Sequence, residues 1–211
     1  MHLPEGKGGT IIDPNLMLME SEPVIGTGEW SDAQCQNFKT IENGNIVLVR
    51  RGSQALALCQ IISDNFNSDS LCEKFINDNF RKVKILAWAN EFRQPRAGLF
   101  SQGTFSSCRK GTEQYRYIES WLKYMNDIKY LEKCSNLLLK KRNIILQGAP
   151  GTGKTYNTAA IALKTLGVTD IDLTDHKAVM KRYDSLLGDQ IFFTTFHQSL
   201  DYEDFVEGLK P

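Results

Sequence analysis

Gly148-Ala149-Pro150-Gly151-Thr152-Gly153-Lys154-Thr155 matches the phosphate-binding pattern G-x-x-x-x-G-K-[ST] at every fixed position. An apolar run at 143–147 precedes it and predicts a buried parallel strand, and the residues after it predict a helix over 155–166. A strand, a glycine-rich turn and a helix N-terminus together form an anion site, because the N–H groups of the first helical turn point toward the phosphates. The alternative interpretation is a chance glycine-rich turn.

The chemistry of this loop predicts which residues bind a nucleotide. The predicted nucleotide-binding residues are Gly148, Ala149, Pro150, Gly151, Thr152, Gly153, Lys154 and Thr155. Lys154 would neutralise charge on the β- and γ-phosphates, and the Thr155 hydroxyl would be the metal ligand for Mg²⁺. We therefore expect Mg²⁺ with GTP or ATP as the cofactors, and the sequence leaves the choice of nucleotide open.

Composition limits the other function classes. The 211 residues contain 25 Lys and Arg and 25 Asp and Glu, so nucleic-acid contact requires a local basic patch. The five cysteines form no C-x-x-C pair, so they indicate neither a zinc site nor a disulfide framework. The N-terminus lacks a signal-peptide pattern, and no apolar run approaches the roughly 20 residues of a membrane span. These features predict a cytoplasmic protein without membrane contact.

The pattern along the chain predicts four segments. They are an irregular or partly extended lead-in at 1–28, a mainly β domain at 29–112, a helical connector at 113–140 and the N-terminal part of a P-loop domain at 141–211. The predicted fold class is α+β: a small β-barrel domain, a helical connector, and then the start of an α/β P-loop domain.

Within the first domain, the apolar runs at 45–50 and 55–62 flank a glycine-containing turn and predict a hairpin. A third strand is predicted at 82–88 and a short helix at 69–80. Residues 113–140 have apolar side chains at steps of three or four, which predicts an amphipathic helix.

The C-terminal segment predicts three further elements. They are a helix at 175–187 closed by Gly188, a strand at 191–196 and a short helix at 202–209. This strand–helix–helix–strand order is typical of the first half of a parallel nucleotide-binding domain.

Residues 193–211, Phe-Thr-Thr-Phe-His-Gln-Ser-Leu-Asp-Tyr-Glu-Asp-Phe-Val-Glu-Gly-Leu-Lys-Pro, carry a second signature. This segment closely resembles the T-F-H-Q-S-x-x-Y-E-D-F-[VI]-E-G-[IL]-[KR]-P segment of the McrB family, and the phosphate loop is similar to that family's loop. The McrB family comprises AAA+ motor subunits of modification-dependent restriction systems. The resemblance implies a GTP- or ATP-dependent motor, a homo-oligomeric ring in the full-length form, a partner nuclease subunit and DNA as the target.

The resemblance assigns no role to the family motif residues. They are His197, Gln198, Ser199, Tyr202, Glu203 and Asp204. From the residues alone, two roles are open for His197. It is either a residue on the ligand side or at an interface, or it is a structural residue. The carboxylates of Glu203 and Asp204 either form a solvated helix face or meet a neighbouring subunit.

A motor of this family also needs a Walker B acidic strand, a sensor residue, arginine fingers and a helical lid. None of these follows Pro211 in the sequence, so we expect the chain to be a fragment of a longer protein or a truncated gene product. The catalytic residues are therefore unknown, and hydrolysis by these residues alone is doubtful because the attacking water lacks a base.

Residues 28–53 resemble the opening of PUA-like domains of the EVE/YTH type, with Asn45 where Asp is usual. The resemblance implies a small barrel that holds a flipped modified base, such as a methylated one, between aromatic faces. The candidate DNA- and base-binding residues are Trp30, Ser31, Asn37, Trp88, Arg50 and Arg51. The alternative for Trp88 is a core position, since it ends an apolar strand, and the alternative for the arginines is a solvated surface.

Three functions remain open at this point. The first is a nucleotide-dependent restriction motor subunit with an N-terminal reader of modified DNA. The second is a non-hydrolysing, DNA-binding fragment of such a subunit. The third is a different P-loop NTPase, such as another AAA+ ATPase or a small-molecule kinase, with an unrelated β domain.

Overall fold

The computed structural model describes residues 14–28, 33–75, 77–100 and 105–195. The chain divides into two compact units, Met1–Met125 and Asn126–Pro211. Trp30, Ser31 and the family motif beyond Thr195, with the short helix predicted at 202–209, lie outside the described residues.

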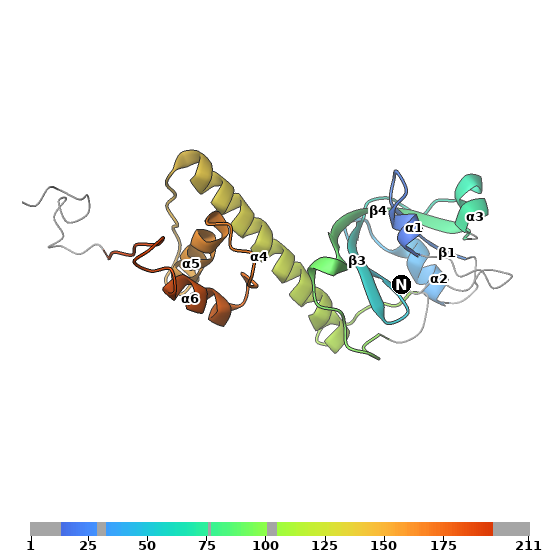
Figure 1. The fold of residues 1–211 in the computed structure, drawn as a ribbon. Coiled ribbons are helices and arrows are strands. Elements are labelled where there is room, and N and C mark those ends of the chain that lie inside the picture. The colour runs from blue at the N-terminus through green and yellow to red at the C-terminus, as the bar shows by residue number, and fades with distance from the viewer. Residues whose placement is uncertain (1–13, 29–32, 76, 101–104, 196–211) are drawn as a thin grey trace, which may run out of the picture. The chain divides into compact units, whose positions relative to one another are not determined.

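The first unit is built on a four-stranded antiparallel sheet with the order β1-β4-β3-β2 (Figure 1). The strands are β1 (Val24–Thr27), β2 (Ile46–Arg51), β3 (Gln54–Ile61) and β4 (Asn79–Trp88). The predicted hairpin is confirmed, because β2 pairs with β3 across a turn in which Gly52 has a φ of 58°. Only glycine adopts that backbone conformation without a steric cost.

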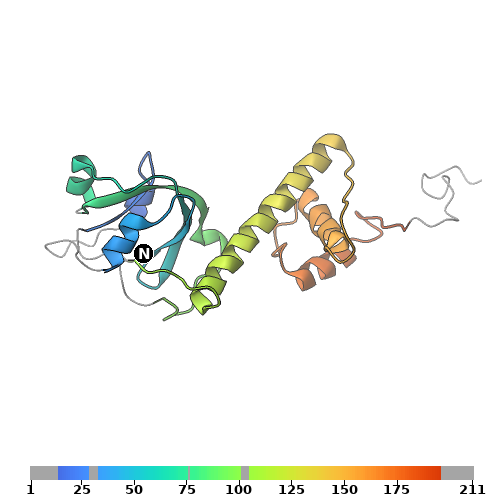
Figure 2. The ribbon, with the colours of Figure 1, turned by 180° about the vertical axis from the view of Figure 1, so that it is seen from behind.

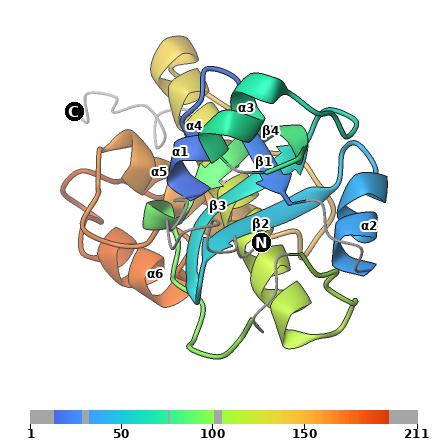
Figure 3. The same ribbon diagram turned by 90° about the vertical axis from the view of Figure 1, so that its right-hand side faces the viewer.

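The sheet is curled, so that its two edge strands border one core (Figure 3). Ile25 of β1 and Val47 and Val49 of β2 belong to the same buried cluster as Ala57 and Cys59 of β3. Side chains alternate between the two faces of a strand, and Leu48 accordingly lies on the opposite, outer face. The result is a curled antiparallel half-barrel, which is compatible with the predicted small barrel.

Helices cover both faces of this sheet. They are α1 (Pro14–Leu18), α2 (Ala33–Thr40), α3 (Asp69–Phe75), the 3₁₀ turn η1 (Ala89–Glu91) and the first part of α4 (Glu113–Lys141). Tyr117 and Trp121 of α4 pack on the outer face of the sheet with Leu48 and Leu58. The side chain of Trp121 is fully buried in this packing.

A buried arginine fastens α2 to β4. The guanidinium of Arg81 donates hydrogen bonds to the carbonyl oxygens of Phe38 (2.9 Å), Lys39 (2.6 Å) and Ser63 (3.0 Å). Phe38 and Lys39 lie in the last turn of α2, where carbonyl groups lack helical partners and the helix dipole favours a cation. Arg81 thereby holds α2 in position beside the sheet.

In the second unit, the C-terminal part of α4 packs with α5 (Lys154–Thr165) and α6 (His176–Asp184) (Figure 2). Leu131 of α4, Ala160 and Leu163 of α5 and Val179 of α6 form its buried core. The side chain of Asp175 accepts hydrogen bonds from the backbone N–H groups at the start of α6, which explains why the helix begins there. The helices predicted at 155–166 and 175–187 are confirmed to within a few residues, but α6 ends at Asp184, four residues before the predicted Gly188 cap.

The two strands predicted in the second unit are wrong. Residues 143–147 form no ladder, and the side chain of Ile145 is 83% exposed. Within the described part of 191–196, only Ile191 takes part in β-pairing, through an isolated bridge to Leu187. An apolar run becomes a strand only when a neighbour pairs with its backbone, and no described segment does so here.

Two further predictions are incomplete in the first unit. The lead-in at 1–28 contains β1, which agrees with a partly extended segment, and also α1, a helix that the prediction lacks. The helix predicted over 69–80 stops at Phe75, and β4 begins at Asn79. Phe80 pairs with β1 at Gly26, where a Cβ atom would lie only 2.9 Å from the phenyl ring, so strand pairing in this region depends on that glycine.

Candidate functional sites

The predicted phosphate loop leads directly into α5 and has the backbone shape that its glycines permit. Gly151 and Gly153 have φ values of 79° and 77°, in the left-handed region. A Cβ atom at either position would meet nothing within 4 Å, so the backbone conformation alone favours glycine there. Gly153 is the N-cap of α5, whose first residue is Lys154.

The side chain of Lys154 folds back over this loop. Its ammonium group donates hydrogen bonds to the carbonyl oxygens of Gly148 (2.9 Å) and Ala149 (2.7 Å). The hydroxyl of Thr152 donates to the Ala149 carbonyl at 2.9 Å. The loop is therefore closed by its own side chains, with a cation held next to the start of a helix.

The loop opens into a cleft of about 980 Å³ that continues along α4. Its walls come from the C-terminal part of α4, the extended segment before the loop, and the first turn of α5. The lining residues are Tyr130, Lys133, Cys134, Leu137, Lys141, Asn143, Ile144, Ile145, Leu146, Gln147, Gly148, Thr152, Lys154 and Asn157. This lining contains three lysines and no Asp or Glu, so its charge suits an anion.

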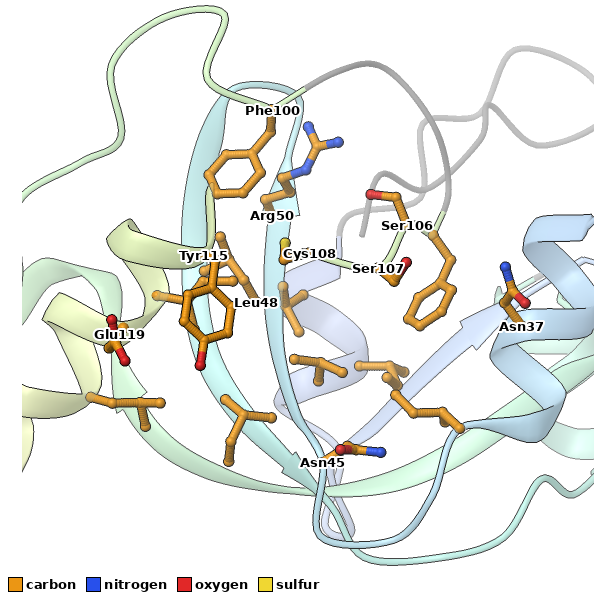
Figure 4. Close-up of a pocket in the computed structure, with 18 residues that line it drawn as sticks. Asn37, Asn45, Leu48, Arg50, Phe100, Ser106, Ser107, Cys108, Tyr115 and Glu119 are labelled. Carbon is orange, nitrogen blue, oxygen red and sulfur yellow. The ribbon is translucent and has the colours of Figure 1, made fainter. Parts of the chain in front are cut away.

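The first unit holds a second cavity, of about 690 Å³, along the edge strand β2 (Figure 4). Arg50 and Phe100 lie at one end, Asn45 at the other, and Asn37 of α2 and Glu119 of α4 at the sides. The lining residues are Ile25, Asn37, Ile41, Asn45, Ile46, Val47, Leu48, Val49, Arg50, Phe100, Phe105, Ser106, Ser107, Cys108, Tyr115, Ile118, Glu119 and Leu122. Three aromatic rings and several polar groups thus converge on one apolar pocket, as in many ligand sites.

Arg50 is the main cation of this pocket. Its guanidinium carbon lies 5.5 Å from the centroid of the Phe100 ring, and a guanidinium N–H donates to the carbonyl oxygen of Gly52. Burial lowers the pKa of Arg50, and burial likewise raises the pKa of the neighbouring Cys108 thiol. At neutral pH the pocket therefore offers a charged arginine beside a protonated thiol.

The structure brings together only some of the predicted base-binding residues. Asn37 and Arg50 both line the pocket, and Arg51 is exposed at the end of β2. Trp88 is 36% exposed at the end of β4, so the core alternative for it is wrong. Trp88 lines a separate small pocket with Gln54 and Gln94.

Sequence reasoning missed the aromatic residues of the main pocket. Phe105 lies edge-on to Phe38 of α2, with ring centroids 5.8 Å apart, and Tyr115 comes from the first turn of α4. The sequence offered one signal for the aromatic lining of this pocket, an aromatic residue inside the glycine-containing segment 98–105. Apolar rings in a loop need a packing partner or a ligand.

The chain is locally basic next to this pocket. The segment 93–116 contains Arg93, Arg96, Arg109, Lys110 and Arg116, against a single acidic residue, Glu113. Nε of Arg96 lies 2.6 Å from a carboxylate oxygen of Glu113, and this ion pair lowers the pKa of Glu113. A chain with zero net charge therefore has a local cluster of positive charge in a segment that helps to line the pocket.

In the described part of the chain, no group of three His, Cys, Asp or Glu side chains is arranged to hold a metal ion. None of the described helices combines the length and hydropathy that a membrane span requires.

Comparison with known proteins gives one relationship. No protein-family model matches the chain, and no solved structure matches it. The chain is 35% identical over 91 residues to the Type IV methyl-directed restriction enzyme EcoKMcrB subunit of Escherichia coli (strain K12). The match covers 41% of this chain and 16% of that protein, so the chain spans a small part of the relative's length. The chain is thus similar, over part of its length, to the McrB subunit of a methyl-directed restriction enzyme.

Proposed function

We propose that the chain is part of a nucleotide-binding subunit of a modification-dependent restriction system, in which the second unit binds GTP or ATP with Mg²⁺. The observation that carries the proposal is the loop before α5, with Gly151 and Gly153 at positive φ and Lys154 folded over it. The similarity to the McrB subunit supports the same function. A homo-oligomeric ring and a nuclease subunit are the partners that this proposal implies.

The loop residues fit a bound triphosphate. The Lys154 ammonium would exchange two neutral carbonyl acceptors for phosphate oxygens, and hydrogen bonds to charged partners are the stronger ones. The exposed Thr155 hydroxyl is available as a Mg²⁺ ligand, and the metal would neutralise phosphate charge. The described residues supply binding and orientation, and we assign them no hydrolytic step.

Calorimetric titration of residues 1–211 with GTP and with ATP, each with and without Mg²⁺, tests this function. We expect saturable 1:1 binding of at least one nucleotide that strengthens when Mg²⁺ is present. Absence of binding at millimolar nucleotide would contradict the proposal.

The first unit is proposed to bind DNA and to hold one extruded, modified base in the pocket beside β2. The cavity of about 690 Å³ lies within the usual size range of small-ligand pockets, about 300–1,000 Å³. Phe105 and Tyr115 offer aromatic faces for stacking, and Asn37 offers an amide for the base edge. The basic residues of 93–116 would contact phosphates, which position DNA without reading its sequence.

Binding of duplex oligonucleotides that carry unmodified or methylated cytosine or adenine tests the reader. We expect Asn37→Ala to remove the preference for a modified duplex, because Asn37 lines the pocket. Gln36→Ala is the matched control, since Gln36 is exposed on the same helix and does not line the pocket. Equal, salt-sensitive affinity of the wild-type chain for all duplexes would exclude base reading and leave phosphate contact alone.

A further inference from the structure

The cleft next to the phosphate loop extends along one face of α4. Tyr130, Lys133, Cys134, Leu137 and Lys141 line it from that helix, and their spacing of three or four residues places them on one stripe. From Tyr130 to Lys141 the helix rises about 16 Å. The stripe that lines the cleft therefore spans about three turns of α4.

The side chains on this stripe are open to the cleft. Tyr130 is 42% exposed and Leu137 is 44% exposed, although both are large apolar or aromatic residues. Lys133 and Lys141 flank Leu137 and, with Lys154, give the cleft its three positive charges. An anionic ligand that also carries an aromatic ring matches this arrangement.

We propose that this stripe of α4 is the nucleoside wall of the site: Tyr130 stacks on the base, Leu137 packs against the nucleoside, and Lys133 contacts the phosphate nearest the ribose. The inference rests on the proposed function, because it assumes that the loop before α5 holds the phosphates. It adds a part of the site that the phosphate-loop pattern does not contain, and it assigns α4 a direct role in ligand binding.

The contacts proposed for this stripe of α4 are expected to contribute measurably to nucleotide affinity. Stacking of a base on an aromatic side chain contributes about 1–3 kcal/mol. The lining contains no carboxylate that could repel the phosphates. The amide side chains of Asn143, Gln147 and Asn157 can donate and accept, so the wall suits purine bases without selecting one.

The test compares ATP and GTP with inorganic tripolyphosphate, which has the anionic end of the ligand and lacks the nucleoside. We expect Tyr130→Ala to weaken the binding of ATP or GTP at least fivefold and to leave tripolyphosphate binding unchanged. Tyr130→Phe should retain wild-type affinity, because it keeps the ring and removes only the hydroxyl. Lys154→Ala should weaken all three ligands.

Two matched pairs of variants on α4 distinguish the loss of a nucleoside contact from a general effect on the helix. Leu137→Ala should weaken nucleotide binding and Leu139→Ala should not, because both are exposed but only Leu137 lines the cleft. Lys133→Ala should weaken it and Lys129→Ala should not, since Lys129 is also exposed on α4 and lies outside the cleft.

If neither Tyr130→Ala nor Leu137→Ala changes nucleotide binding, the proposed nucleoside wall is wrong, while the proposed phosphate site at the loop before α5 still stands. A wild-type chain that binds neither nucleotide nor tripolyphosphate would overturn the proposed function and the wall together. Equal weakening of tripolyphosphate and nucleotide by Tyr130→Ala would also overturn the wall, because the effect would then not involve the nucleoside.

Discussion

The ammonium nitrogen of Lys154 lies 2.7 Å from the carbonyl oxygen of Ala149, to which it donates a hydrogen bond. This contact holds a lysine across the mouth of a glycine-rich loop at the start of a helix. The same ammonium group donates a second hydrogen bond, to the carbonyl oxygen of Gly148, so two contacts hold the lysine against the loop. An anion that displaces these carbonyls would meet a cation that is already in place, so little reorganisation is needed for binding.

The loop glycines should matter for binding through the backbone alone. In Gly151→Ala, an alanine would be forced into the left-handed region, which costs about 1–2 kcal/mol, although a Cβ has open space there. We expect nucleotide affinity to fall by about tenfold, together with a lower midpoint of urea unfolding that reflects the same backbone strain.

Gly167→Ala is the matched control for that variant. Gly167 has a φ of 75° and equally open surroundings, but it follows the C-terminus of α5 and lies outside the cleft. Its substitution should cost similar stability and leave nucleotide affinity unchanged. If both variants bind nucleotide like the wild type, the shape of the loop is not required for binding.

Trp121 should be the main aromatic support of the first unit. Its side chain is fully buried and stacks on Phe92, with ring centroids 5.3 Å apart. Trp121→Ala should lower the free energy of unfolding by about 3–5 kcal/mol, as large-to-small core substitutions do. Trp88→Ala should cost less than half as much, because that ring is partly exposed. Urea unfolding followed by circular dichroism measures both, and equal costs would contradict the packing described here.

The stability of the first unit should fall at alkaline pH because of Cys59. Burial raises the pKa of this thiol from 9.0 to about 12, so the folded state keeps it protonated while the unfolded state ionises. The stabilising contribution is complete below pH 9 and is lost as the pH rises toward 12, with about 1.4 kcal/mol lost at pH 10.

The comparison with Cys59→Ala isolates that effect. The difference in unfolding free energy between wild type and Cys59→Ala should shrink by about 1.4 kcal/mol from pH 7 to pH 10. Other titrating groups contribute equally to both proteins and cancel. A difference that stays constant with pH would show that the thiol does not ionise on unfolding in this range.

The sequence predicted the elements whose pattern is local. The β2–β3 hairpin follows from two apolar runs around Gly52, and α4 follows from apolar residues at steps of three or four. The prediction of a partly extended lead-in did not locate the four residues of β1, because a short strand that contains Gly26 has no local signal. Its pairing with β4 depends on a tertiary contact, the approach of Gly26 to Phe80.

The candidate sites were predictable to different degrees. The whole candidate phosphate loop lies in eight consecutive residues, so its glycines and Lys154 could be named in advance. The pocket beside β2 combines Asn37, Arg50, Phe105 and Tyr115 from four separate segments, and only the fold brings them together. The strand predicted at 143–147 failed for the same reason, since pairing depends on a neighbour that a local pattern does not contain.

The most direct test of the central claim is the dissociation constant for Mg²⁺-bound ATP and GTP in Lys154→Ala compared with Lys177→Ala. Lys177 is exposed on α6 and does not line the cleft, so it controls for the loss of one positive charge. We predict that Lys154→Ala weakens binding by about tenfold or more, which corresponds to the loss of a charged hydrogen bond worth about 1.5–3 kcal/mol, and that Lys177→Ala binds like the wild type. Equal affinities in the two variants would contradict a phosphate site at the loop before α5.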